Sequence, residues 1–379
     1  MVDQEKKKQK PKPAKGLEAV LVKRLRQSQA KLKENSLDAL IISSSPNRHY
    51  LSGWKSDAES GWLVITPDVS YILTDSRYTE HAINETTGFK VVEYESSVAS
   101  FFGDFSKKLK FKRVGFESHD ISIFNFKRLK KYCKHLKLIP KAHLIEDIRV
   151  VKDEVEIENL KKAIGIADKA FIHILNFAKP GMAEKEIAWE MEKYMRGIGA
   201  EKMAWDPFIV ASGANSSMAH WGAGTRKIKK NDMVLVDYGC VYEGYHSDTT
   251  RVFFMGRPSG EQKRIYNLVL EAKKLGQSLI KEGKVGAVVD KKVRESLEKN
   301  TSHFYRHSLG HGVGLEVHEL PRISIHSKNK LLNGSVLTVE PGVYIPGWGG
   351  VRLEDIVLVK ENGVEVLTKA PKDIKEVTI

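Results

Sequence analysis

The stretch VLVDYGCVYEGYHSDTTRVFF, residues 234–254, indicates how the second half of this chain folds. The apolar run 233–236 predicts a buried strand that ends at Asp237, and eleven residues later Asp248 precedes a second apolar run. A hairpin centred on residues 242–243 would place the two carboxylates directly opposite each other, with Cβ atoms about 5 Å apart. Such a pair repels, and a divalent cation removes that penalty. On its own, the pair does not decide between metal binding and structural roles, in which Asp237 caps the end of a strand and Asp248 is a turn residue.

A second acidic hairpin is predicted from TVEPGVYIPGWGGVRLEDIVLV, residues 338–359. Glu340 follows an apolar strand and Glu354 lies fourteen residues further on, so a hairpin centred on Gly347 brings these carboxylates face to face. An ion pair between Glu354 and Arg352 is the alternative. Because one acidic hairpin occurs in each half of a repeated plan, coincidence is the weaker explanation.

Between the two hairpins lies HSLGHGVGLEVHE, residues 307–319, which is rich in imidazoles and glycines. A lone histidine is more often a hydrogen-bonded or surface residue than a metal ligand. The position of this segment favours one ligating histidine and two that face a substrate, whereas Glu316 and Glu319 are expected to be ordinary surface charges. The three candidate histidines are His307, His311 and His318.

These donors restrict the choice of metal. Four carboxylates and one imidazole form a hard, oxygen-rich set that suits Mn²⁺ best, with Co²⁺, Fe²⁺ or Zn²⁺ as substitutes. The set is too large for a single catalytic zinc, which keeps three protein ligands. Two ions about 3.5–4 Å apart, bridged by carboxylates and a hydroxide, fit the donors and predict metal-assisted hydrolysis.

Composition and length limit the remaining possibilities. The 379 residues are 41% hydrophobic and 29% charged, which is ordinary for a globular protein and enough for two domains. No apolar run approaches the roughly 18 residues of a membrane span, and residues 1–16 have no apolar segment typical of a secretory signal. Because Cys133 and Cys240 form no CxxC pair, a reducing cytoplasm is expected.

The formal net charge of +14 could attract nucleic acid, but much of it looks diffuse. Residues 5–15 read as a disordered, solvated tail, and further basic residues fall in predicted helices around 107–112 and 127–137. No RNP-like aromatic strand and no zinc-finger spacing accompanies them. Nucleic-acid binding is therefore not the expected function.

Hydrophobic periodicity divides the chain into a basic tail, a small α/β domain and a larger C-terminal domain. The small domain, residues 17–145, alternates helices and strands and begins with an amphipathic helix at 17–35. In residues 150–379, two runs of helix, helix and strands begin near Val155 and Ile265, which predicts an internal duplication around a shared sheet. The strands predicted there are 207–211, 233–238, 335–339, 342–345 and 355–359.

Taken together, these segments resemble the creatinase, aminopeptidase P and prolidase family of pita-bread metallopeptidases. The family pattern has two aspartates eleven residues apart, then a GHG histidine, a VEPG glutamate and a final RxED glutamate, and all are present in order. The match spans about residues 155–379, region 17–145 resembles the creatinase-type N-terminal domain, and only the tail at 1–16 is unmatched. The resemblance implies two metal ions held by Asp237, Asp248, His311, Glu340 and Glu354.

The resemblance also implies roles for three other histidines. His318 would contact the substrate and steady the tetrahedral intermediate, and His220, at the end of IVASGANSSMAHWG, would contact the scissile region. His307 is typical of the proline-specific members. Where the family usually has proline before the histidine of the IVASGANSSMAHWG loop, this chain has Ala219, which puts the shape of that loop in question.

Two charged residues would support the metals. Arg352 matches the arginine of the last motif and would hydrogen-bond around Asp248, and Glu340 would serve as both ligand and proton shuttle. Methionine aminopeptidases lack the N-terminal domain, and creatinases have lost much of the metal set. The resemblance therefore implies an Xaa-Pro aminopeptidase or Xaa-Pro dipeptidase, which accommodates the fixed φ and missing N–H of proline.

The expected partner is a peptide with proline at its second position, and the family implies a homodimer without membrane association. A methionine aminopeptidase-like or creatinase-like hydrolase is one alternative. A non-catalytic binding relative is the other, but such a protein should have lost metal ligands, and this chain keeps all five.

Overall fold

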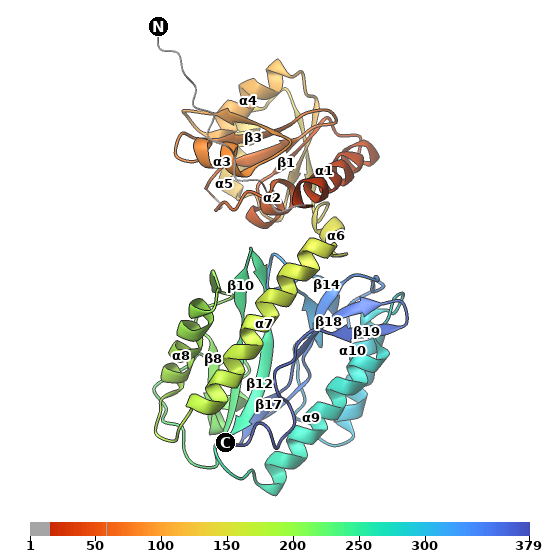
Figure 1. The fold of residues 1–379 in the computed structure, drawn as a ribbon. Coiled ribbons are helices and arrows are strands. Elements are labelled where there is room, and N and C mark those ends of the chain that lie inside the picture. The colour runs from red at the N-terminus through yellow and green to blue at the C-terminus, as the bar shows by residue number, and fades with distance from the viewer. Residues whose placement is uncertain (1–15, 58) are drawn as a thin grey trace. The chain divides into compact units, whose positions relative to one another are not determined.

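The computed structural model describes residues 16–57 and 59–379, so all of the predicted basic tail except Gly16 lies outside the described residues. The chain forms two compact units that divide between Arg149 and Val150. Both units combine helices and strands (Figure 1), and the α/β class predicted from the sequence is confirmed. In the described ranges, no helix combines the length and apolar character that crossing a membrane requires.

The first unit is built on a single six-stranded sheet. Its strands are β1 (Ala39–Ile42), β2 (Trp62–Ile65), β3 (Ser70–Thr74), β4 (Phe89–Glu93), β5 (Arg113–Glu117) and β6 (Lys137–Lys141). They are arranged in the order β4-β3-β2-β1-β5-β6, with β1 antiparallel to β2 and parallel to β5. The central strands β1 and β2 are apolar throughout because both of their faces are buried.

In the described part of the first unit, six helices accompany this sheet. They are α1 (Leu17–Glu34), α2 (Ser45–Ser52), α3 (Thr79–Glu85), α4 (Val98–Lys108), α5 (Ile123–Tyr132) and α6 (Glu146–Arg149). The amphipathic helix expected at residues 17–35 is α1, and it buries Leu21 and Leu32. Helices α4 and α5 pack together where Gly103 lies against Tyr132, since an added Cβ there would come within 2.9 Å of the Tyr132 carbonyl oxygen.

The second unit contains two helix pairs. Its helices are α7 (Glu154–Phe177), α8 (Glu184–Gly197), α9 (Gly260–Leu279) and α10 (Gly286–Glu298), with a short 3-10 helix η1 (Gly213–Ser217). α7 packs on α8 and α9 on α10, so the repeated two-helix plan predicted from the sequence is confirmed. α7 and α9 each start with a capping box, formed by Asp153 with Glu156 and by Ser259 with Gln262, which explains where both helices begin.

The strands of the second unit follow each helix pair. Those after α8 are β7 (Lys202–Met203), β8 (Ile209–Ser212), β9 (Met233–Tyr238), β10 (Cys240–Tyr242), β11 (Tyr245–His246) and β12 (Thr249–Phe254). Those after α10 are β13 (Gly310–Gly312), β14 (Glu319–Ile323), β15 (Val336–Val339), β16 (Gly342–Ile345), β17 (Gly349–Arg352), β18 (Asp355–Lys360) and β19 (Gly363–Val366). α7 packs against β10, α8 against β8, and α9 against β17 and β19 (Figure 1).

The register of the first acidic hairpin differs from the prediction. Asp237 pairs with Thr250 rather than with Asp248, because the turn is formed by Glu243 and Gly244 instead of residues 242–243. Both turn residues have positive φ, 48° and 80°, as a tight two-residue hairpin turn requires. Asp248 is therefore a diagonal neighbour of Asp237 on the same face of the sheet, still within reach of a shared ligand.

The register of the second acidic hairpin agrees with the prediction. In the β16–β17 ladder Ile345 pairs with Gly349, so the hairpin is centred on Gly347, which adopts a left-handed φ of 77°. The β15–β18 ladder continues the same register, with Val339 opposite Asp355. Glu340 and Glu354 occupy the interruption between these two ladders and consequently stand opposite each other.

Candidate metal centre and active site

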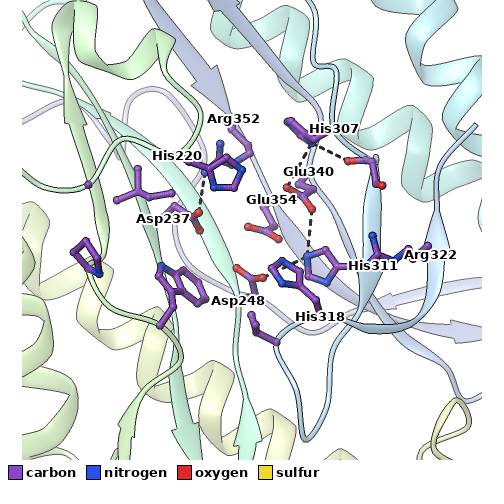
Figure 2. A pocket seen from close by; sticks show the side chains of 16 residues that line it. His220, Asp237, Asp248, His307, His311, His318, Arg322, Glu340, Arg352 and Glu354 are labelled. Carbon is purple, nitrogen blue, oxygen red and sulfur yellow. Dashed lines mark hydrogen bonds and ion pairs between the residues drawn. The ribbon is translucent and has the colours of Figure 1, made fainter. Parts of the chain in front are cut away.

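Both acidic hairpins lead to one cavity of about 530 Å³ within the second unit (Figure 2). The structure brings together every site residue considered from the sequence, although these residues come from separate strands and loops between His220 and Glu354. The residues in the cavity wall are His220, Asp237, Asp248, His307, His311, His318, Glu340, Arg352 and Glu354. A cavity of this volume is in the range that binds small molecules and short peptides.

Backbone hydrogen bonds fix the positions of the acidic and imidazole side chains. The N–H of Glu354 donates to the carbonyl oxygen of Thr250 at 3.1 Å, which joins the second hairpin to the first. The N–H of His311 donates to Oγ1 of Thr338 at 3.1 Å. Gly310 is required beside it, because a Cβ at this position would lie 1.9 Å from the carbonyl oxygen of Thr338.

The four carboxyl groups carry more negative charge than the surrounding protein neutralises. Burial raises the pKa of Asp248 and of Glu354 well above the usual range, and the neighbouring carboxylates add to the effect. Burial also raises the pKa of Asp237, although Arg352 opposes it. For Glu340 burial acts in the same direction, but the His311 ring 3.4 Å away outweighs it and lowers the pKa to about 2. Such a cluster is stable only with protons or cations bound.

The donor atoms fit a pair of neighbouring divalent ions. One group joins Asp237, Asp248 and Glu354 and another joins His311, Glu340 and Glu354, with the ligand atoms of each group within 4.8 Å of one another. Glu354 belongs to both groups, as a bridging ligand would. Oδ1 of Asp237 is buried without a hydrogen-bond partner among the described residues, which is the acceptor that a cation would satisfy.

Arg352 supports this cluster through Asp237, not through Asp248 as the sequence suggested. Its Nη2 donates to Oδ2 of Asp237 at 2.8 Å, and its Nε donates to Oγ1 of Thr250 at 2.9 Å. Thr250 in turn donates to Oε2 of Glu354 at 2.9 Å. The expected partner was wrong because the shifted hairpin register places Thr250, rather than Asp248, opposite Asp237. One guanidinium thus orients two carboxylates.

The protonation of His307 follows from its neighbours. Nδ1 lies 2.8 Å from the carbonyl oxygen of Ser308, so it carries the proton, and Nε2 then accepts from the hydroxyl of Tyr344 at 3.1 Å. That hydroxyl accepts from Nη1 of Arg352 at 2.9 Å. Burial lowers the pKa of His307, which agrees with a neutral ring at neutral pH.

The other two histidines lie on different walls of the cavity. The ring of His318 stands edge-on to that of His311, with centroids 4.3 Å apart, and burial and the neighbouring imidazole lower its pKa to about 4. His220 follows Ala219, whose carbonyl oxygen accepts from Nη1 of Arg352 at 3.1 Å. The loop carrying His220 is therefore fastened to the metal-centre scaffold although it lacks the usual proline.

Sequence reasoning missed one charged residue of this cavity and misjudged another charged residue nearby. Arg322 lies directly opposite His311 in the β13–β14 ladder, is exposed, and forms no ion pair with any described residue. The sequence feature that could have identified Arg322 is its position, a cation four residues after His318. Glu319, expected to be a surface charge, is instead buried in an ion pair with Lys152, and both side chains are at most 4% exposed.

Comparison with known proteins agrees with this architecture. Residues 158–361 match the model of metallopeptidase family M24, and residues 24–151 match the creatinase/prolidase N-terminal domain. An uncharacterized peptidase of Bacillus subtilis (YqhT) is 40% identical over 339 residues, which cover 89% of this chain and 95% of that protein.

Solved structures are similar over nearly the whole chain. The Xaa-Pro dipeptidase from Bacillus anthracis superimposes with a TM-score of 0.90 at 36% identity, covering 95% of this chain and 100% of that one. The X-Pro aminopeptidase from Thermotoga maritima gives a TM-score of 0.85 at 36% identity, covering 92% and 100%. The family resemblance and the pita-bread fold expected from the sequence are confirmed. The chain belongs to metallopeptidase family M24 and carries the N-terminal domain of the creatinases and prolidases.

Proposed function

We propose that this protein is an Xaa-Pro peptidase, which hydrolyses the bond between an N-terminal residue and proline. The observation that carries the proposal is a single cavity that gathers four carboxylates, of which Asp248 and Glu354 are buried, and His311 with three further histidines. The similar structures from Bacillus anthracis and Thermotoga maritima, named as an Xaa-Pro dipeptidase and an X-Pro aminopeptidase, support this specificity.

Two divalent ions would be held by the donors of the two acidic hairpins and the GHG histidine, with Mn²⁺ preferred for its affinity for oxygen ligands. When bound, such ions lower the pKa of a water molecule and polarise the scissile carbonyl. The proposed ligands are Asp237, Asp248, His311, Glu340 and Glu354.

The protein's own groups would then move protons and hold the substrate. Glu340, kept ionised by His311, accepts the proton of the attacking water at its carboxylate and passes it to the proline nitrogen. His220 and His318 face the cavity as hydrogen-bond donors for the carbonyl oxygen, where negative charge develops. His307 accepts a hydrogen bond from the Tyr344 hydroxyl at Nε2, so it positions this side of the cavity and does not act as an acid.

One feature of the cavity favours dipeptides over longer peptides. A dipeptide ends in a carboxylate immediately after proline, and Arg322 offers an exposed guanidinium in the cavity wall opposite His311. Arginine binds a carboxylate through two charge-assisted hydrogen bonds. The apolar side of the same cavity contains Trp205, Pro207 and Ile209, which suit the pyrrolidine ring. We infer an Xaa-Pro dipeptidase as the main activity.

The test is release of glycine from Gly-Pro and from Gly-Pro-Gly-Gly by metal-stripped protein, before and after Mn²⁺ is restored. The proposal expects metal-dependent cleavage, faster for the dipeptide. Met-Ala-Ser and creatine are the control substrates, because their turnover would identify a methionine aminopeptidase-like or creatinase-like hydrolase. If bound metal is verified and neither proline substrate is cleaved, the Xaa-Pro assignment is wrong.

We also propose that the protein is a cytoplasmic homodimer. The family resemblance supports the dimer, and the two free, buried cysteines, Cys133 and Cys240, agree with a reducing compartment. Light scattering after gel filtration measures the mass in solution, and a mass near the 42.7 kDa of a single chain would exclude the dimer.

A further inference from the structure

A second group of candidate metal ligands lies in the first unit. It consists of His119, which follows β5, His143, which precedes α6, and Glu146, the first residue of α6. Their donor atoms all lie within 4.8 Å of one another. Nε2 of His119 is 2.9 Å from Oε1 of Glu146, and the two imidazole rings are stacked with centroids 4.8 Å apart.

The carboxylate of this group is held rigidly. Glu146 is only 9% exposed, and its Oε1 accepts from Nδ2 of Asn47 at 2.6 Å. Asn47 is fully buried, and its own Oδ1 accepts from Nη1 of Arg149 at 2.7 Å, so the orientation of the amide is fixed. Oε2 of Glu146 is buried and lacks a hydrogen-bond partner among the described residues. A buried acceptor without a partner is costly.

The charge around Glu146 favours a cation. Oε1 of Glu146 accepts a hydrogen bond from Nδ2 of Asn47 and lies 2.9 Å from Nε2 of His119, as the oxygen of an ionised carboxylate does. Glu117, which also accepts from Nδ2 of Asn47 at 2.6 Å, is a second acidic group next to it. The guanidinium of Arg149 hydrogen-bonds Asn47, which leaves Oε2 of Glu146 without that donor.

We propose that His119, His143 and Glu146 bind one transition-metal ion, with Zn²⁺ as the preferred ion and water as the fourth ligand. Two imidazoles and one carboxylate are donors that zinc accepts, whereas the oxygen-rich cavity of the second unit suits Mn²⁺. Zn–N and Zn–O distances near 2.0–2.1 Å place neighbouring donors roughly 3.3 Å apart in a tetrahedron. The 2.9 Å pair therefore has to open by only a few tenths of an ångström.

The site has the surroundings that metal ligands need. Asn47 supports the carboxylate from behind, as the outer hydrogen-bond partners of metal ligands do. Both imidazoles are exposed, so an ion can reach them from solvent. Bound there, the ion would join the turn after β5 to the start of α6, two segments that are 24 residues apart between His119 and His143. Zinc would then stabilise the C-terminal end of the first unit.

The experiment uses the full-length protein with Asp248→Asn and Glu354→Gln, which removes ligands of the second unit, and Zn²⁺ alone as the probe. Calorimetric titration of the metal-stripped protein, with elemental analysis after gel filtration, gives the number of ions bound. We expect one equivalent, lost when His119→Gln or His143→Gln is added. Circular dichroism verifies that each variant is folded.

A matched control is His81→Gln. His81 also pairs with a glutamate, with Nε2 3.0 Å from Oε1 of Glu85, but no third ligand joins that pair from residues 16–57 or 59–379, so this variant should keep the equivalent. If the double variant binds no zinc, or if the equivalent survives His119→Gln, the site does not exist. Should the double variant fail to fold, the wild-type protein must lose one equivalent with His119→Gln while its peptidase activity with Mn²⁺ is unchanged.

Discussion

Glu354 and Asp355 are adjacent in the chain, yet their carboxylates lie in opposite electrostatic environments. Glu354 faces other carboxylates in the cavity, and burial among them raises its pKa well above the usual range. Asp355 faces three cations, with Nη2 of Arg251 at 2.9 Å and Nζ of Lys273 and Lys372 at 2.6 and 2.9 Å. Burial would raise the pKa of Asp355 too, but Arg251 and the two lysines lower the pKa far below its usual value.

The two environments arise because successive residues of a strand point to opposite faces. β12 alternates in the same way, since Thr250 hydrogen-bonds Glu354 and Arg251 hydrogen-bonds Asp355. Where a buried carboxylate holds the fold together, the protein supplies its own cations. Where the carboxylates line the cavity, four of them share one guanidinium, that of Arg352, which leaves negative charge for a metal to neutralise. The charge balance of the two faces therefore separates a structural cluster from a metal-binding one.

The largest effect is expected from Glu354→Gln. Loss of the proposed bridging ligand should lower kcat/KM for Gly-Pro at least about 10³-fold, or about 4 kcal/mol of transition-state free energy. The metal-free variant should melt at a higher temperature than the metal-free wild type, because one repelling charge is gone, yet Mn²⁺ should no longer raise its melting temperature. Calorimetry with and without Mn²⁺ measures this, and full Mn²⁺ stabilisation in the variant would contradict a shared metal site.

Asp355→Asn should have the opposite profile. It leaves Arg251 buried without its counter-ion and Nζ of Lys273 without its acceptor, which is expected to lower the free energy of unfolding by about 3–5 kcal/mol. The folded fraction should still bind Mn²⁺ and cleave Gly-Pro. Urea denaturation of the metal-free protein gives the stability change. A decrease of less than about 1 kcal/mol in the free energy of unfolding would mean that the basic groups around Asp355 do not need this carboxylate as a partner.

Arg322→Ala tests whether the guanidinium in the cavity wall binds the C-terminal carboxylate of a dipeptide. Without the guanidinium, kcat/KM for Gly-Pro should fall about 10–100-fold, the equivalent of one charge-assisted hydrogen-bonded pair, mainly through a higher KM. Cleavage of Gly-Pro-Gly-Gly should change little. Arg257→Ala, at an exposed position that does not line the cavity, is the matched control. Equal losses for both peptides would exclude recognition of the terminal carboxylate.

The smallest effect is a pH dependence of stability. Burial lowers the pKa of Lys273 from 10.5 to about 7, although Asp355 opposes this. Between these pH values the unfolded chain binds the proton and the folded protein does not, so the free energy of unfolding rises with pH by up to about 1.4 kcal/mol per unit. Lys273→Met should lack that rise. Denaturation of both metal-free proteins at pH 7.5 and 9 measures it, and parallel curves would show that Lys273 stays charged.

Much of the second unit could be predicted because its signals are local. Strand bounds at 233–238 and 342–345 agree with the structure, since apolar runs there end at a charged residue or a proline-glycine turn. Glycines mark the turn at Gly347. The turn of the first hairpin lies one residue later than predicted, because Gly244 tolerates the left-handed φ that the turn requires and Tyr242 does not.

Other features depend on tertiary packing and could not be predicted locally. α2 is a short helix with few apolar residues at helical spacing, so its sequence shows no periodic pattern that would predict a helix. The partner of Arg352 depends on the register of a hairpin about a hundred residues earlier in the chain. Likewise, the burial of Glu319 is set by Lys152, which lies in a distant segment of the sequence. Such contacts are decided by which elements pack together.

The hydrogen bond from the N–H of Glu354 to the carbonyl oxygen of Thr250 has a consequence for how the protein is made. The proposed ligands extend from Asp237 to Glu354, so the second acidic hairpin completes the centre 117 residues after the first ligand, since 354 − 237 = 117. A nascent chain on the ribosome therefore exposes both aspartates long before the last glutamate is synthesised. Tight metal loading would therefore have to wait until Glu354 is synthesised and the two hairpins have come together.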